Sequence, residues 1–410
     1  MGRNEQPRRK MPNVTAKLDE PALSDRAGEI LQLPEAERVT NNALFGGNKL
    51  KLGLFCTNGH GAALTLAPEA KDLSWEYSLR TAIAADEAGL EAIVPFARWK
   101  AYAKDRPGHK TGSVFDPFVW AAGMASVTRN ISIFATSHAP SLHPIVAAKQ
   151  AATIDHISGG RFALNVVGGW NRPELEMFGA EMREHDERYE YLGEWLTVIR
   201  RLWTENEEFD HHGTFFNVVG GTSSPKPLQN SIPIMNAAGS PRGMRFAAEH
   251  ADLCFVIVHS EDPEEIRKQV DSYKSAAREQ FGREIRVWTH SVVVQEETDA
   301  AAEAELRRFS VEYEDAESVD AWLQLMEVNS QMLPPEVAAE MRQRFAAGAG
   351  GFPLVGTSET IAQRLEMLSD AGIDGVLLTW LDYDAGLSNF TGDVLPRLEK
   401  AGLRAPNTRR

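Results

Sequence analysis

The chain is poor in cysteine and in long apolar runs. These two shortages disfavour a disulfide-bonded protein and a membrane protein. It has 410 residues but only two cysteines, Cys56 and Cys254, each inside an apolar, strand-like run. This placement predicts two buried thiols rather than a disulfide. No apolar stretch reaches the ~18 residues of a membrane helix, and no apolar segment typical of a secretory signal follows the charged start. We therefore expect a soluble, cytoplasmic protein that does not bind membranes.

Positive charge and several well-known motifs are also scarce. The chain has 43 Lys and Arg against 58 Asp and Glu, a net charge of −15, which disfavours broad binding to nucleic acid. There is no Walker pattern, no Gly-x-Ser-x-Gly, and no Gly-x-Gly-x-x-Gly after the first expected strand, which disfavours nucleotide folds and triad hydrolases. The pairs His138/His143 and His211/His212 lack the spacing and carboxylates of a zinc site, so no metal is expected.

What the chain does contain is a regular alternation of apolar strand-like runs with helical segments. The eight runs are 49–55, 92–96, 131–135, 162–167, 232–238, 253–258, 286–295 and 375–381. Alternation favours a parallel sheet, and the number eight favours a closed (β/α)₈ TIM barrel of the α/β class. Residues 299–351 look helical and acidic and are longer than a usual connection, so we predict a helical insertion, or lid, between strands seven and eight.

The two ends of the chain fall outside the predicted barrel. Residues 1–45 are polar and rich in Arg, Asn, Glu and Pro, which predicts an extension that is partly disordered or lies on a neighbouring subunit. The barrel domain is predicted to span 46–400, and 401–410 to form a short tail.

One stretch, 153–179, is the first place to look for a site. Two glycines permit a turn before the apolar strand Phe162–Val167, which carries a single polar residue, Asn165. A loop with two further glycines, Trp170 and Glu174 follows the strand. In α/β barrels chemistry collects in the loops after the carboxyl ends of strands.

Other polar side chains follow other expected strands, and a barrel gathers such strand ends around one mouth. They are Arg98, Thr136, His138, Gly239 and Ser240. The Gly-Ser pair could present backbone N–H groups to a phosphate. From the pattern alone, Asn165 as a satisfied core residue and Trp170 as a packing residue are as well supported as a role in a site. The pair Arg188-Tyr189 fits a solvated Arg beside a packed Tyr better than a binding pair.

At these residues the chain resembles the bacterial luciferase-like, flavin-dependent monooxygenases. Within them it is most similar to the group of pyrimidine oxygenase, dimethylsulfone monooxygenase and alkanesulfonate monooxygenase. The resemblance is carried by SGGRFALNVVGGW at 158–170 with HDERYEY at 185–191, and by KLGLF, NRPELEMFG, GTFFNV, SPKPLQ and AAGSPRGM elsewhere. It covers roughly 50 to 400 and implies a (β/α)₈ barrel, in agreement with the count of strands.

The resemblance implies a cofactor, a reaction and partners. The cofactor is FMN, used in its reduced form and supplied by a separate NAD(P)H:flavin reductase. O₂ would be activated as a flavin (hydro)peroxide that oxygenates or cleaves a small organic substrate, such as an N-heterocyclic amide or a sulfone or sulfonate. The family tends to form homodimers or homotetramers.

The resemblance also assigns roles to single residues. The cofactor contacts fall on Ala97, Arg98, Thr136, Asn165, Glu174, Arg188, Tyr189, Gly239 and Ser240. Within this set Arg188, Tyr189 and Ser240 would hold the phosphate. The oxygen-side pocket falls on Val94, Thr136, Asn165 and Trp170, and Arg98 or His138 would orient the substrate. His138 could alternatively move a proton near neutral pH.

The chain departs from the family pattern at the reactive face of the flavin. Ala97-Arg98 stands where the pattern has Ile-Lys, and Val94 replaces Leu. These changes leave the substrate open. Two other functions also stay open: hydride transfer with a deazaflavin (F420), which occurs in the same superfamily, and non-catalytic flavin binding.

Overall fold

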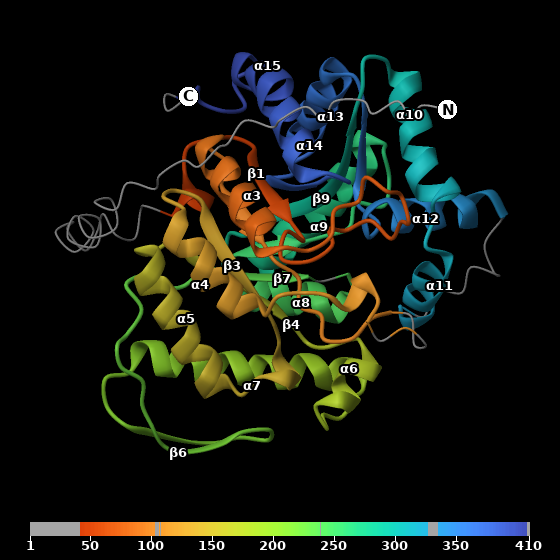
Figure 1. Cartoon of the computed structure of the whole chain (residues 1–410). Helices are drawn as coiled ribbons and strands as arrows, with labels where there is room; N and C mark the ends of the chain where they lie inside the picture. Colours follow the sequence, from red (N-terminus) through yellow and green to blue (C-terminus); the bar gives the residue numbers. More distant parts are fainter. Residues whose placement is uncertain (1–41, 103–105, 107, 238, 327–334, 408–410) are drawn as a thin grey trace, which may run out of the picture.

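A closed barrel of eight parallel strands forms the centre of the protein (Figure 1). The computed structural model describes residues 42–102, 106, 108–237, 239–326 and 335–407. The barrel strands are β1 (Lys51–Phe55), β2 (Ala92–Val94), β3 (Ser132–His138), β4 (Phe162–Val167), β7 (Ile234–Ala237), β8 (Leu253–Phe255), β9 (Arg286–Gln295) and β11 (Gly375–Thr379). Each strand pairs with the next in this order, and β11 pairs with β1. The predicted TIM barrel is therefore confirmed.

The strands are apolar on both faces because both faces are covered. In β2, Ile93 packs outward in the main core between strands and helices, whereas Ala92 and Val94 pack inside the barrel. This is the period-two alternation of a strand. Leu44, in a short 3-10 helix (Ala43–Phe45), joins the cluster of side chains that fills the barrel. Ordered packing thus begins within the predicted extension, whose residues 1–41 lie outside the described part of the chain.

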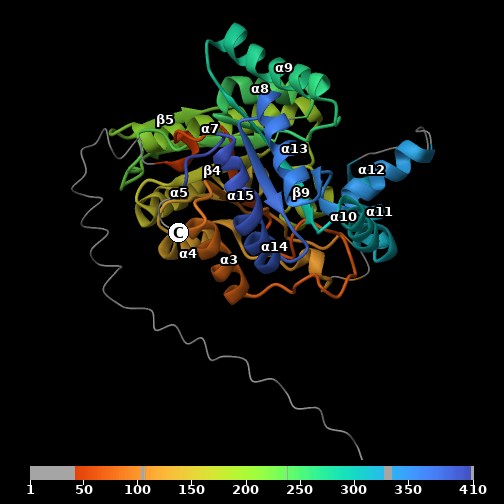
Figure 2. The ribbon, with the colours of Figure 1, turned by 90° about the horizontal axis from the view of Figure 1, so that it is seen from above.

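The helices surround the barrel, as Figure 2 shows from above. They are α3 (Trp75–Glu87), α4 (Pro117–Val127), α5 (Pro144–Ser158), α6 (Arg172–Met177), α7 (His185–Thr204), α8 (Pro241–His250), α9 (Pro263–Phe281), α13 (Ser358–Asp370), α14 (Tyr383–Asn389) and α15 (Leu395–Lys400). Their starts follow from local chemistry: Asp116, Ser240 and Asp262 each accept a hydrogen bond from a backbone N–H of the first turn, and a proline follows each cap. Among the described helices none is long and apolar enough to cross a membrane.

Two elements were not among the predicted strands. β10 (Phe352–Gly356) pairs with β9 alongside the closed ring. It finds a partner because β9 is long: its first part, Arg286–Trp288, pairs with β8, whereas Ser291–Gln295 pairs with β10. The second element is an antiparallel hairpin of β5 (Phe209–His212) and β6 (Asn217–Gly221), which extends past α7 in Figure 1.

The predicted helical insertion is present between the last two barrel strands. It contains α10 (Asp299–Arg307), a π-helical turn at 308–312, α11 (Ala316–Leu325) and α12 (Pro335–Gly348). Figure 2 shows α10, α11 and α12 gathered on one side of the barrel. Trp322 of α11 and Phe345 of α12 pack edge to face, with ring centroids 4.5 Å apart. Leu64, Tyr102 and Trp170 belong to the same cluster, so the insertion rests on loops of the barrel mouth.

Candidate active site

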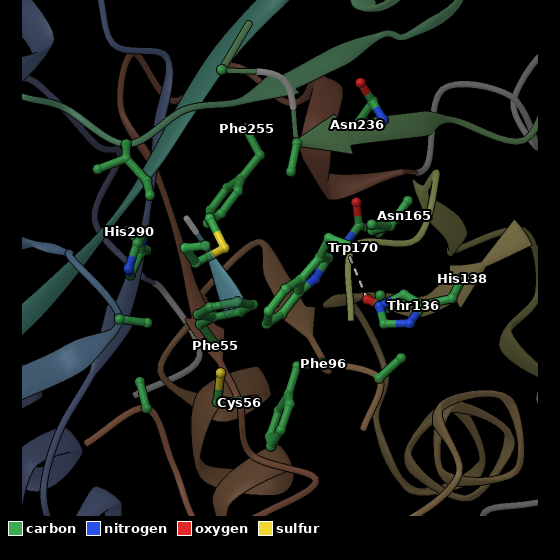
Figure 3. Close-up of a pocket in the computed structure, with 18 of the residues that line it drawn as sticks. Phe55, Cys56, Phe96, Thr136, His138, Asn165, Trp170, Asn236, Phe255 and His290 are labelled. Atoms are coloured by element: carbon green, nitrogen blue, oxygen red, sulfur yellow. Dashed lines mark hydrogen bonds between the residues drawn. The ribbon is translucent and has the colours of Figure 1, made fainter. Parts of the chain in front are cut away.

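A cavity of about 630 Å³ lies at the carboxyl ends of the barrel strands (Figure 3). Its wall is formed by residues at the ends of β1, β3, β4, β7 and β8, by His290 within β9, by loops that follow the strands, and by the insertion with α11 and α12. The size falls in the range of roughly 300–1,000 Å³ that is usual for cofactor and small-molecule sites. The predicted site residues Ala97, Arg98, Thr136, His138 and Asn165 all line it.

Thr136 and Asn165 form a hydrogen-bonded polar pair in the cavity wall. They are register partners on β3 and β4. The Asn165 Nδ2 donates to Thr136 Oγ1 over 3.0 Å, and the Thr136 hydroxyl donates to the Pro95 carbonyl. The Oδ1 of Asn165 is buried without a partner. An amide acceptor left open at a cavity wall costs free energy unless a ligand supplies a donor.

Asn236 repeats this arrangement on the next strand, and sequence reasoning missed it. Its register partner on β4 is Val166, whose carbonyl accepts from Asn236 Nδ2 over 2.7 Å. Its Oδ1 is also buried without a partner, and the residue lines the cavity. The signal was available, since Asn236 is a single polar residue in an otherwise apolar run, as Asn165 is.

The Arg98 side chain is buried and fixed by an acidic residue and two aromatic rings. Its side chain is only 4% exposed, and its guanidinium lies 3.3 Å from Glu174 Oε1 and donates over 2.6 Å to the Tyr102 hydroxyl. The guanidinium also lies 4.3 Å from the ring centroid of Tyr102 and 5.0 Å from that of Trp170. Arg98 therefore presents a fixed positive charge to the cavity between two aromatic rings.

Glu174 lies behind the cavity wall and contacts residues of the loop after β2. It is 1% exposed and is not part of the cavity wall. Its Oε1 accepts from the backbone N–H groups of Trp99 (2.9 Å) and Lys100 (3.3 Å) as well as from Arg98. The cofactor contact that the resemblance assigns to Glu174 stays a prediction; in the structure its Oε1 bridges α6 to the loop after β2, and its Oε2 is buried without a hydrogen-bond partner.

His138 is a neutral group in this setting. Burial, and after it the charge of Arg98, lower the pKa of His138 to about 3. Its Nδ1 lies 3.7 Å from Glu174 Oε2, beyond hydrogen-bond distance. An imidazole with so low a pKa is almost never protonated at neutral pH. His138 can position a substrate but is poorly suited to carry a proton as a cation.

Another part of the cavity wall offers groups that can bind an anion. Ser240 caps α8 and accepts from the Gly243 N–H over 3.1 Å. A Cβ at Gly243 would lie 2.4 Å from the Tyr189 hydroxyl, so the glycine lets this hydroxyl approach the first turn of the helix. Arg188 is fixed by a 3.0 Å bond to the Gly169 carbonyl, and its Nε is buried without a partner. A helix N-terminus with an Arg and two hydroxyls suits a phosphate.

Val94 lies below this site rather than in it. The side chain is 1% exposed and packs inside the barrel with Phe134 and Met235. It is not among the residues of the cavity wall. Its oxygen-side role stays a prediction that this position does not favour. Trp170 does line the cavity, against Arg98.

Sequence reasoning also missed an aromatic wall. The wall consists of three rings that line the cavity together: Phe55 at the end of β1, Phe255 at the end of β8, and His290 within β9. In sequence they read as ordinary core residues of apolar runs. Over the described ranges there is no group of three or more His, Cys, Asp or Glu placed to hold a metal ion.

Comparison with known proteins identifies the family. The model of the luciferase-like monooxygenase family matches residues 50–375. The chain belongs to this family. Pyrimidine monooxygenase RutA of Acinetobacter baylyi is 30% identical over 361 residues, covering 85% of this chain and 94% of that protein. Membership confirms the predicted family and the predicted enzyme class, a flavin-dependent monooxygenase.

Solved structures agree with the fold. Riboflavin lyase RcaE, in a structure with modified FMN and riboflavin, has a TM-score of 0.76 at 21% identity and covers 87% of this chain and 92% of its own. The long-chain alkane monooxygenase LadA has a TM-score of 0.74 at 23% identity, with coverages of 88% and 94%. At these identities the likeness supports the barrel and its insertions only.

The luciferase-like monooxygenases are flavin dependent, and the residues of this chain fit FMN. The unpartnered amide oxygens of Asn165 and Asn236 match the ring N–H groups of an isoalloxazine. Ser240, Tyr189 and Arg188 match its phosphate. Both sets line the one cavity, whose volume suits a flavin and a small second molecule.

Proposed function

We propose that this chain is the oxygenase of a two-component system. It takes reduced FMN from a separate NAD(P)H:flavin reductase and oxygenates or cleaves a small organic substrate, with an N-heterocyclic amide or a sulfone or sulfonate as the first classes to test. The observation that carries the proposal is that one cavity is lined both by a buried open acceptor, Asn165 Oδ1, and by the groups of Arg188, Tyr189 and Ser240 that suit an anion.

Reduced FMN, when bound, supplies two electrons, so that one atom of O₂ enters the substrate and the other leaves as water. The chain's own residues orient and shield this reaction. Asn165 has an open Oδ1 acceptor and a second N–H beside the one bonded to Thr136, so it can hold a ring N–H and donate to an oxygen atom. Arg98 supplies a fixed positive charge where negative charge develops.

Water is kept out by the insertion. Trp322 and Phe345 pack with Leu64, Tyr102 and Trp170, and all five side chains line the cavity. Such a cover strengthens electrostatic contacts beneath it and protects a reactive site from solvent. Movement of this insertion would admit the substrate and then close over it.

The remaining parts of the proposal concern partners and place. The sequence has no dinucleotide fingerprint after its first strand, which fits the delivery of electrons from NAD(P)H by a separate protein. Both cysteines are free and buried, which fits a reducing cytoplasm. We also propose a homodimer or homotetramer. Exposed apolar side chains on α4 and α5, such as Val119 and Val146, support a contact between copies.

A comparison of electron donors tests the proposal. The protein is mixed with reduced FMN or a reduced deazaflavin, with and without O₂, over a panel of cyclic amides and sulfones. Product that requires both reduced FMN and O₂ supports the monooxygenase. Product formed with the deazaflavin in the absence of O₂ would replace it with a hydride-transfer enzyme, and tight FMN binding without any product would indicate a flavin-binding protein.

Asn165 gives a sharper test of the mechanism. Asn165→Ala removes the open acceptor and the spare donor but none of the phosphate groups. We expect FMN to bind within about tenfold of wild type, since one neutral hydrogen bond is lost, and product formation per reoxidised FMN to fall by about 10²-fold or more. Unchanged coupling of oxidation to product would remove Asn165 from the mechanism.

A further inference from the structure

The cavity is divided into a polar side and an aromatic side. Thr136, Asn165 and Asn236 lie on the neighbouring strands β3, β4 and β7. Phe55, Phe255 and His290 lie on β1, β8 and β9. Figure 3 shows these rings together on one side of the cavity, away from Thr136 and Asn165. If the flavin ring uses the open acceptors, the aromatic side is left for the substrate.

The three rings form one continuous wall. The centroids of Phe255 and His290 are 5.3 Å apart with the rings inclined by only 28°, so they stack. Phe55 is tilted against both, with its centroid 5.5 Å from each. Aromatic walls of this kind bind flat rings better than bulky aliphatic groups, because a flat ring meets them in stacked or edge-on contact.

His290 brings an imidazole to this wall, and the roles of its two ring nitrogens follow from their contacts. Its Nε2 lies 3.0 Å from the Gly348 carbonyl, so Nε2 carries the proton and Nδ1 is an acceptor. Nδ1 is buried without a partner in a side chain that is 2% exposed. Burial lowers the pKa of His290 to about 4, which keeps the ring neutral. The wall therefore offers one acceptor that lacks a donor.

Charge narrows the class of ligand. The chain has 58 acidic residues, yet no Asp, Glu or Lys is among the described residues of the cavity wall. The Glu174 carboxylate lies outside the wall and forms an ion pair with Arg98. An organic cation would find no compensating charge, which makes its burial costly. The cavity also has to hold a flavin within its volume of about 630 Å³, so the second molecule is small.

We propose that the aromatic side is the substrate subsite and takes a small, planar ring compound that carries no positive charge and whose N–H or O–H donates to His290 Nδ1. Phe55 and Phe255 provide the stacking surface, and His290 selects the donor. This inference rests on the proposed function in one respect: the flavin occupies the polar side. It is a statement about binding, so it can be tested apart from turnover.

The test uses the full-length protein loaded with oxidised FMN and four probes, whose affinities are measured by isothermal calorimetry. Phenol has a planar ring and a hydrogen-bond donor, and anisole has a planar ring but no donor. Cyclohexanol has a donor on a non-planar ring, and benzylammonium has a planar ring and a positive charge. We expect phenol to bind about tenfold more tightly than anisole, as one hydrogen bond allows. Cyclohexanol should bind more weakly than phenol, and benzylammonium should not bind.

Two variants locate the preference. His290→Phe keeps an aromatic ring in the wall but removes the acceptor, so phenol and anisole should bind equally. His156→Phe makes the same exchange on the exposed outer side of α5 and should keep the preference. FMN affinity, measured by flavin fluorescence, should be within twofold of wild type in both.

Equal binding of phenol and anisole to the wild type, or a preference that survives in His290→Phe, would overturn the subsite. Tight binding of benzylammonium would overturn the charge argument. None of these results affects the proposed oxygenase, whereas failure of the protein to bind FMN would count against the oxygenase before any probe is added.

Discussion

The bridge between Glu174 and Arg98 gives a prediction whose size follows from the structure. Both side chains are at most 4% exposed. The Glu174 carboxylate accepts from Arg98 and from two backbone N–H groups of the same loop. Glu174→Ala would leave a buried guanidinium without its counter-charge and free the loop. Loss of one partner of a buried pair costs about 3–5 kcal/mol of unfolding free energy.

The assay is urea unfolding followed by fluorescence and circular dichroism. A matched control is the exposed pair Arg80–Asp384, whose atoms are 3.0 Å apart but whose side chains are 60% and 43% exposed. Asp384→Ala should cost less than about 1 kcal/mol, since solvent screens such pairs. The double variant Arg98→Met/Glu174→Met should recover much of the loss, because no buried charge remains.

A loss below about 1 kcal/mol for Glu174→Ala, equal to that of the control, would refute the view that this bridge organises the loop after β2. A loss of the expected size with unchanged FMN affinity would support the reading of Glu174 as a positioning residue. Direct contact with the cofactor would instead weaken FMN binding in the conservative variant Glu174→Gln.

Two further predictions concern the phosphate end and the pH dependence of stability. Gly243→Ala should weaken FMN binding by about tenfold or more but leave riboflavin binding unchanged, because its Cβ would displace the Tyr189 hydroxyl from the phosphate-binding groups. The control is Gly392→Ala, where the added Cβ meets open space. Equal loss of affinity for FMN and riboflavin in Gly243→Ala would argue against a phosphate site there. The pKa values of His138 and His290 are lowered from 6.5 to about 3 and about 4, so the unfolded chain binds more protons than the folded chain below pH 6.5. The free energy of unfolding should therefore fall by up to about 1.4 kcal/mol per imidazole for each pH unit below 6.5, and His290→Phe should reduce this slope in denaturation measured between pH 7 and pH 5.5.

The barrel could be predicted because its strands carry the signal themselves. Each barrel strand is covered on both faces and so reads as an apolar run between turn signals. β10 and the β5–β6 hairpin do not. β10 is a short run that contains a proline. It forms because β9 continues beyond the part that pairs with β8 and offers a free edge there. β5, Phe-Asp-His-His, is mostly polar and pairs only within its hairpin.

The polar part of the site could be predicted for a geometric reason, and its limits are geometric too. Strand ends share one mouth, so Thr136 and Asn165 could be expected near each other; their hydrogen bond itself follows from their being register partners. Which way a side chain points is harder to predict: Val94 faces the barrel interior because strand residues alternate. Glu174 is turned away by its bonds to the loop after β2. The two phenylalanines of the aromatic wall, Phe55 and Phe255, gave no signal, because a phenylalanine that lines a cavity looks in sequence like one in a core.

The most direct test of the central claim is a single turnover under ¹⁸O₂. The protein is loaded anaerobically with one equivalent of reduced FMN and a substrate found in the panel, mixed with ¹⁸O₂, and the product is analysed by mass spectrometry. We expect one ¹⁸O atom per product molecule in the wild type and its loss in Asn165→Ala. Product without ¹⁸O, or oxidation of FMN with no product from any substrate that binds, would contradict it.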